Sequence, residues 1–551
     1  MDPEPIRTAP PRLPAALVLL LATAPAQAAA VAPAVPQWAA LQARHARIAE
    51  IQVQDTDVFD LTQKSDNNRL GRLGNRLHMT TREGVIRRAL LFQVGDPVNV
   101  RRIQETERYL RTLVFLKDAR VDLQPLPDGT VRAVVWVRDA WTLKLSAGYQ
   151  QVGGQPSSNF GLQEQNLMGT GKTLAFSYAR NPTQITDTLA YGDPQLFGSS
   201  WTLNTDYQHL SNGTARGLTL QRPFTSLDTP WSVTAQFSST GSVLTIFDRN
   251  SSIYSIPSQL NNASLGMAWA LWHDEDQAWR PGLQVVNLEA RYGAATTLAE
   301  PFGLPVPDLT ARTLRGPAVT VAYLAEDFRV YRDLLAMDTH EDYNLGWAGS
   351  LTLGHYLPDW GSSESAPFVQ GQVSKAWSAT DGDLLLAQSS FSGRRGPGGW
   401  QDALTNLTVT GYWKETPAVI SAAHLVLDRA CHPDPEDIYY LGATQGLNGY
   451  PNNLHPGDAR WELSLNQRFL TEQRWWGVVR LGYMAFADLG AIHRLDGSGW
   501  SPAYSDLGGG LRFGDLKSSL GKVILVTFSV PLERQPGQDR WQLNFGNTVQ
   551  F

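Results

Sequence analysis

The sequence predicts a mainly β protein, in which an antiparallel β-barrel of about 16 strands follows one small α/β domain. Three observations support this prediction. Large apolar residues alternate with small or polar ones from about residue 139 to the C-terminus, aromatic residues make up 10% of the chain, and 48 glycines and 33 prolines supply turns. Helical periodicity is confined to the first part of the chain, so the barrel follows the α/β domain.

Composition excludes several classes of protein. The 551 residues include 46 Lys+Arg and 52 Asp+Glu, and a net charge of −6 argues against nucleic-acid binding, which depends on clustered positive charge. A mean hydropathy of −0.25 excludes a polytopic helical membrane protein, and a single cysteine excludes a disulfide framework. The sequence shows no G-x-S-x-G elbow or H-E-x-x-H pair, so we expect no catalytic residue, no cofactor and no metal site.

The N-terminus predicts export. Arg7 and Arg12 precede an apolar stretch over residues 13–24, which is followed by Ala26-Gln27-Ala28. This pattern is typical of a secretory signal peptide covering residues 1–28, and the stretch is shorter than the ~20 residues of a membrane anchor. Residues 29–44 are rich in alanine and proline, which predicts a flexible leader.

Residues 45–138 predict the α/β domain. A short β-like run is followed by a helix started by Asp66, in which Leu70, Leu73 and Leu77 share one face. Two more helices follow, and then a Pro-Asp-Gly turn at residues 127–129 joins two apolar runs as a hairpin. The predicted order is therefore β-α-α-β-β, with one helix inserted after the first strand.

Residues 139–551 predict the barrel. Leu265, Met267 and Trp269 alternate with Ser264, Gly266 and Ala268, and similar runs recur to the end of the chain. A soluble sandwich would give the same alternation. Export, and Trp and Tyr near the strand ends, favour a barrel in lipid, where every backbone polar group must be paired internally. At ~25 residues per strand with its loop, this segment holds about 16 strands.

The last eight residues carry a further pattern. A polar residue, a glycine, an apolar residue and a terminal aromatic residue stand at Asn544, Gly546, Val549 and Phe551. This spacing resembles the C-terminal signal of bacterial outer-membrane barrels. An ordinary final strand that happens to end in Phe is the alternative.

Five ordered motifs resemble the BamA/TamA superfamily, which joins POTRA domains to a bacterial surface antigen barrel. Residues 166–171 read N-L-M-G-T-G, and residues 191–198 contain Y-G-D-P, like the family's first turns. The β-α-α-β-β unit, with residues 90–97 between its helices, resembles a POTRA domain. Gly446-Leu447-Asn448-Gly449-Tyr450 stands where the family has its loop-six motif [VL]-R-G-[FY], and Phe486-Ala487-Asp488-Leu489-Gly490 matches F-x-D-x-G. The resemblance covers residues 45–551.

One position departs from the family pattern. The resemblance implies an arginine in loop six, held in the lumen against Asp488 of the motif that ends at Gly490, but this chain has Asn448. Asparagine can donate a hydrogen bond to Asp488, but it is neutral and shorter. Asp488 then lacks its cation unless Arg460, Arg468 or Arg480 replaces it.

The resemblance implies an insertase or translocator in the bacterial outer membrane, with its POTRA domain in the periplasm. Its partners would be unfolded outer-membrane or secreted polypeptides, the lipid bilayer and a possible periplasmic protein, and not nucleic acid. The last strand of the domain, with Val131, Ala133, Val135 and Val137, is the expected edge for capturing polypeptide by β-augmentation. The alternative is a passive or plugged pore whose POTRA domain docks a periplasmic partner.

Overall fold

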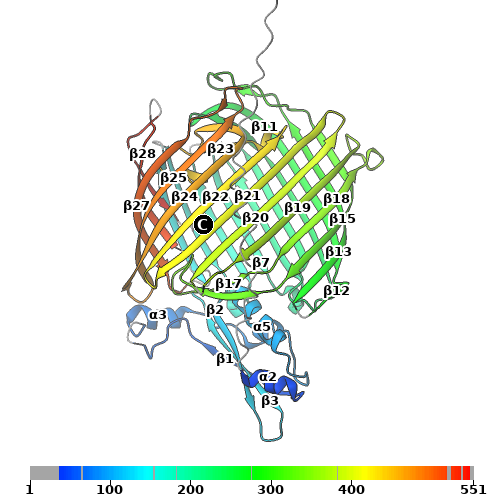
Figure 1. Ribbon diagram of the computed structural model, residues 1–551, viewed down its shortest axis with the longest axis vertical. Helices are drawn as coiled ribbons and strands as arrows, with labels where there is room; N and C mark the ends of the chain where they lie inside the picture. Colours follow the sequence, from blue (N-terminus) through cyan, green and yellow to red (C-terminus); the bar gives the residue numbers. More distant parts are fainter. Residues whose placement is uncertain are drawn as a thin grey trace, which may run out of the picture.

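A computed structural model describes residues 36–63, 66–152, 155–181, 183–274, 276–380, 382–517, 523–534 and 538–546. The predicted signal peptide over residues 1–28 lies outside these residues, as do Val549 and Phe551 of the C-terminal pattern. Figure 1 shows a small α/β domain below a large barrel. We call the barrel end beside this domain the near end and the opposite end the far end.

The α/β domain contains the predicted order of elements. After the first helix come one strand, three helices and two strands, which form a three-stranded sheet in the order β1-β3-β2. Strand β1 runs parallel to β3, and β2 runs antiparallel to it. The bounds are α2 (Pro36–Ala43), β1 (Ile48–Thr56), α3 (Arg69–Leu77), α4 (Glu83–Arg88), α5 (Val100–Thr112), β2 (Leu116–Pro125) and β3 (Val131–Asp139).

The end of the predicted flexible leader is a helix instead. Helix α2 occupies residues 36–43 of the predicted leader, and its Trp38 and Leu41 side chains are buried in the core of the α/β domain. Its Gln42 Oε1 also accepts a hydrogen bond of 2.7 Å from Val100 N at the start of α5. The prediction was wrong here because two apolar side chains outweigh the local Ala/Pro composition.

The predicted edge strand is the centre of the sheet. Strand β3 is hydrogen-bonded to β1 on one side and to β2 on the other, so Val131, Ala133, Val135 and Val137 cannot offer a free edge. The prediction was wrong because the last strand in sequence inserts between the first two in space. The outer strands β1 and β2 carry the free edges of this sheet.

The barrel has about 20 strands among the described residues, rather than 16. They form one closed ring, in which β29 lies beside β4. Four short segments, β12 (Trp272–His273), β14 (Thr296–Thr297), β23 (Tyr439–Leu441) and β26 (Gly499–Trp500), extend longer neighbours. The long strands are β4 (Leu143–Val152), β5 (Gln155–Glu164), β6 (Thr173–Arg180), β7 (Ile185–Asp193), β8 (Thr202–Leu210), β9 (Gly213–Arg222), β10 (Trp231–Asp248), β11 (Ser251–Trp269), β13 (Gln277–Tyr292), β15 (Arg312–Ala325), β18 (Ala348–Tyr356), β19 (Ala366–Trp377), β20 (Asp383–Gly396), β21 (Gly399–Thr416), β22 (Val419–Cys431), β24 (His455–Trp475), β25 (Val479–Arg494), β27 (Tyr504–Asp515), β28 (Val523–Pro531) and β29 (Gln542–Gly546).

The strand count differs because many hairpins are tight. Only two residues separate β8 from β9, β10 from β11, β20 from β21 and β21 from β22. Each strand with its loop therefore uses about 20 residues, against the ~25 assumed from the sequence. Among the described residues, the barrel strands run from Leu143 to Gly546.

Large apolar side chains face outward from the barrel. Leu265 is 56% exposed, and Leu283, Val319, Leu351 and Leu543 on other strands are exposed as well. In a soluble sandwich the large residues would face the core, so this orientation separates the two folds that the alternation left open. A continuous apolar surface of this kind marks a membrane or protein contact, and around a closed barrel it fits lipid. No helix of the described residues is long and apolar enough to cross a membrane.

The α/β domain is docked onto the near end by ion pairs with the barrel turns. Arg101 Nη2 lies 2.6 Å from Asp228 Oδ1 in the β9–β10 turn, and Lys517 Nζ in the β27–β28 turn lies 2.6 Å from Asp66 Oδ2. These turns lie in separate sectors of the barrel wall, so the domain is held at several points around the mouth.

Asp55 of β1 makes the stability of the α/β domain depend on pH. Burial, followed by the nearby Asp139 carboxylate, raises the pKa of Asp55 from 3.8 to about 8. Between these two values the folded domain retains a proton that the unfolded chain releases, so stability falls as pH rises through this window. We predict that Asp55→Asn slows hydrogen exchange in β1 of the full chain by roughly tenfold at pH 5 and by a much larger factor at pH 8. Asp122→Asn, on the exposed face of β2, is the control, and an equal effect at both pH values would contradict the prediction.

Candidate functional site

The predicted loop-six motif lies in a loop that enters the barrel lumen. Residues 432–454, here called the lumenal loop, join β22 to β24 at the far end and contain β23 (Figure 1). Five long strands follow this loop. In a barrel of 16 strands, five strands likewise follow the sixth far-end loop. The strands that this barrel has in addition therefore lie before the lumenal loop in sequence.

The tip of the lumenal loop brings Asn448 against Asp488. Asn448 Nδ2 donates a hydrogen bond of 2.8 Å to Asp488 Oδ2, and both residues are buried. Asp488 lies on β25, between Ser464 of β24 and Asp506 of β27. The structure therefore joins the two motifs that the resemblance paired, with a neutral amide in place of the family's guanidinium.

No arginine of the described residues replaces the missing cation by pairing with Asp488. Arg460 Nε instead lies 2.6 Å from Asp428 Oδ2, Arg468 Nη1 donates to Leu334 O at 2.7 Å, and Arg480 Nη1 lies 3.0 Å from Asp338 Oδ1. Glu462 and Asp506 are buried near the same loop tip. The loop tip thus lies among three carboxylates. Among the described residues of the lumenal loop, Asn448 is the one that donates a hydrogen bond to Asp488.

The other residues of the loop motif fit the lumen closely. A Cβ atom on Gly449 would lie 2.7 Å from Asp506 Cβ, so only glycine fits between the loop and β27. The Tyr450 hydroxyl lies 2.9 Å from the carbonyl oxygens of Ser505 and Glu533, and its ring packs edge-on against Tyr504. Leu447 packs in a small apolar cluster with Leu441, Leu454 and Ile492. Gly490, predicted as part of the lumen partner motif, leaves room for Leu441 and Glu462.

The loop tip also contacts the last two strands. The Asn448 carbonyl oxygen accepts hydrogen bonds from Ser529 Oγ of β28 at 2.8 Å and from Asn544 Nδ2 of β29 at 3.0 Å. Asn544 is the first residue of the predicted C-terminal signal, and Gly546 ends β29 opposite Leu525. Because β29 closes the ring against β4, the lumenal loop is bonded directly to a strand of the seam.

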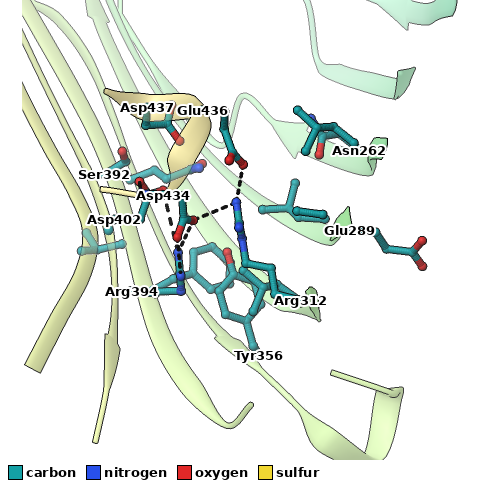
Figure 2. A pocket seen from close by; sticks show the side chains of 18 residues that line it. Asn262, Glu289, Arg312, Tyr356, Ser392, Arg394, Asp402, Asp434, Glu436 and Asp437 are labelled. Carbon is teal, nitrogen blue, oxygen red and sulfur yellow. Dashed lines mark hydrogen bonds and ion pairs between the residues drawn. The ribbon is translucent and has the colours of Figure 1, made fainter. Parts of the chain in front are cut away.

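Two arginines hold the other end of the lumenal loop (Figure 2). Arg394 of β20 donates to both carboxylate oxygens of Asp434, at 2.8 and 3.0 Å, and Arg312 of β15 lies 2.9 Å from Asp434 and also pairs with Glu436. They line a cavity of about 260 Å³. Asp402, Asp434 and Asp437 place carboxylate oxygens within 4.8 Å of one another, and the two arginines balance this charge.

The sequence did not predict that Arg312 and Arg394 bind the lumenal loop. Each is one basic residue within a strand, and no spacing links it to the lumenal loop. The run Asp434-Pro435-Glu436-Asp437 was the available signal, because an acidic loop entering a lumen requires basic partners on the wall.

A second element binds the barrel wall at the near end. Residues 326–347 form the near-end hairpin, built on β16 (Phe328–Arg332) and β17 (His340–Asn344). Arg468, Arg480 and Arg512 of the barrel wall bind Leu334 O, Asp338 and Leu335 O of this hairpin. Two arginines of the α/β domain bind it as well, Arg108 at Glu326 and Arg111 at Asp342. The near-end hairpin therefore links the α/β domain to the lumen.

We predict that Arg394→Gln loosens the lumenal loop. Removal of one partner from a buried ion pair typically costs roughly 3–5 kcal/mol, so amide exchange at residues 434–438 should rise by about tenfold or more. Hydrogen exchange of the full chain in detergent measures this effect. Arg395→Gln, at the exposed neighbouring position, is the control, and equal exchange in the two variants would contradict the prediction.

Comparison with known proteins gives a sequence match over part of the chain. No protein-family model matches the chain. Over 140 residues, 24% of this chain, the sequence is 29% identical to the outer membrane protein assembly factor BamA of Neisseria meningitidis serogroup B. The match covers 17% of that protein's length, so most of the relative lies outside the match.

Two solved structures are similar at low sequence identity. CdiB from Escherichia coli aligns over 91% of this chain and 76% of its own, at a TM-score of 0.45 and 12% identity. BamA from Haemophilus ducreyi lacking POTRA domains 1–3 aligns over 90% and 84%, at a TM-score of 0.39 and 12% identity. The sequence match to BamA supports the predicted resemblance to the BamA/TamA superfamily over the 140 matched residues.

Proposed function

We propose that the protein is a polypeptide insertase or translocator of the outer membrane, and that the lumenal loop and near-end hairpin hold its lumen closed at rest. The α/β domain then acts as a single POTRA domain in the periplasm. The observation that carries the proposal is the bonding of Asn448 to Asp488 and to Asn544 on the last strand. Through it, the lumenal loop is attached to the seam.

The strength of these contacts suits a closure that can be released. A hydrogen bond to a charged group contributes roughly 1.5–3 kcal/mol, and a neutral one about 0.5–1.5 kcal/mol. A polypeptide that pairs with a free strand edge gains main-chain hydrogen bonds of the same size. Several such bonds can therefore compensate the loss of the Asn448 contacts, without any catalytic group. We accordingly propose that the protein is not an enzyme and uses no cofactor.

Capture of polypeptide is proposed at the outer edges of the domain sheet, β1 or β2, because β3 is paired on both sides. In β2, Arg111 Nη1 already donates to Ala119 O and Glu107 Oε1 accepts from Val121 N. A captured segment would displace these side chains of α5. Since Arg111 also binds Asp342 of the near-end hairpin, capture at β2 would disturb the closure of the near end.

The passive-pore alternative is disfavoured by the many contacts that the lumenal loop and the near-end hairpin make with the barrel wall. The lumenal loop is bonded to β15, β20, β25, β28 and β29, and the near-end hairpin to β24, β25 and β27. A passive pore needs a continuous water path between these elements.

A disulfide between the loop and the wall tests the proposal. In a Cys431→Ser background, Asn448→Cys with Asp488→Cys places two thiols where the side chains now touch. We expect cells whose sole copy is this variant to lose the client proteins of the outer membrane or medium when oxidised, and to regain them after reduction. Asn448→Cys alone is the control. Unchanged outer-membrane and secreted proteomes on depletion of the wild-type protein would contradict polypeptide handling.

A further inference from the structure

We infer that helix α3 is a lipid-binding element, which rests its arginine face on the phosphate headgroups of the leaflet beside the near end of the barrel. The helix is inserted after β1. Its contact with lipid does not depend on polypeptide handling by the protein. Helix α3 also takes part in none of the contacts of the proposed closure. Figure 1 shows α3 just below the barrel rim, on the side of β27 and β28.

The inner face of α3 fixes it to the rim. Asn68 caps the helix by accepting from Gly71 N at 2.9 Å, in place of the predicted Asp66, and its Nδ2 donates to Trp476 O of the β24–β25 turn at 3.2 Å. Asp66 instead pairs with Lys517 of the β27–β28 turn. A Cβ atom on Gly74 would lie 2.5 Å from Phe59, so this face packs tightly on the domain.

The outer face of α3 is basic and faces no partner of opposite charge in the part of the chain that the structure describes. Arg69, Arg72, Leu73 and Arg76 follow the i, i+3, i+4, i+7 spacing of one helix face, opposite Gly71 and Gly74, and all four are exposed. Among the described residues none of these arginines forms an ion pair, and Arg72 donates only to Asn67 Oδ1. Leu73 is 51% exposed in the middle of the three.

The neighbouring rim is apolar, which identifies the occupant as lipid. Trp476, whose carbonyl binds the cap of α3, is 68% exposed, and Trp475 beside it is exposed as well. Tryptophan at a barrel rim lies at the headgroup level of the bilayer. The arginines therefore sit next to the layer that contains phosphate groups, and guanidinium groups bind phosphate through paired hydrogen bonds. Charge complementarity and continuity with the lipid-facing wall both select the membrane surface over a soluble partner.

A fluorescence-quenching experiment on the full chain tests this inference. In a Cys431→Ser background, Leu73→Cys carries an environment-sensitive probe, and the protein is placed in nanodiscs that contain phosphatidylglycerol and a lipid with a quencher on its headgroup. The matched control is Val94→Cys, which is equally exposed at 56% on the same domain but lies near the start of β1, away from the rim.

We expect quenching at position 73 to exceed that at position 94 several-fold. It should fall on adding the substitutions Arg69→Gln, Arg72→Gln and Arg76→Gln, in high salt, and in nanodiscs without anionic lipid. Equal quenching at the two positions would overturn the inference, as would quenching at 73 that ignores both the arginines and the lipid charge. Protection of α3 by an added unfolded polypeptide in detergent, without lipid, would assign the face to a protein partner and also overturn it.

Discussion

The whole structure depends on one constraint: in lipid, every backbone N–H and C=O must be bonded within the protein. The chain meets it with a ring in which each strand is paired on both sides, including β29 with β4. The alternation of the strands then sends large apolar side chains to the lipid and polar ones to the lumen. A polar lumen is therefore a consequence of the wall, and it provides the charged groups that the lumenal loop and the near-end hairpin bind.

The lumenal loop and the near-end hairpin bind wall groups of different charge. At one end, the lumenal loop brings the acidic Asp434 to basic wall residues. At its tip, it places the neutral Asn448 among wall carboxylates. The near-end hairpin offers backbone carbonyl groups and Asp338 to wall arginines. Because the tip carries no cation, its attachment to the wall is weaker than an Arg–carboxylate pair would make it.

The sequence predicted what depends on local pattern. The outward face of the strands, the order of the α/β domain and the meeting of Asn448 with Asp488 follow from alternation, periodicity and the motif pair. It did not predict the number of strands, because loop lengths carry no periodicity. It misplaced β3, because the order of strands along a chain does not determine their order in a sheet. The helix around Trp38 and the roles of Arg312 and Arg394 arise only from contacts distant in sequence.

The orientation of the wall is the central claim, and site-directed labelling of β11 tests it most directly. In a Cys431→Ser background, cysteine is placed in turn at Ser264, Leu265, Gly266 and Met267 of the membrane-embedded protein. The structure predicts that positions 265 and 267 react with a lipid-dissolved maleimide, and positions 264 and 266 only with a water-soluble one. The reverse pattern, or reactivity without a period of two, would show that the large residues face a core, and it would contradict the barrel in lipid.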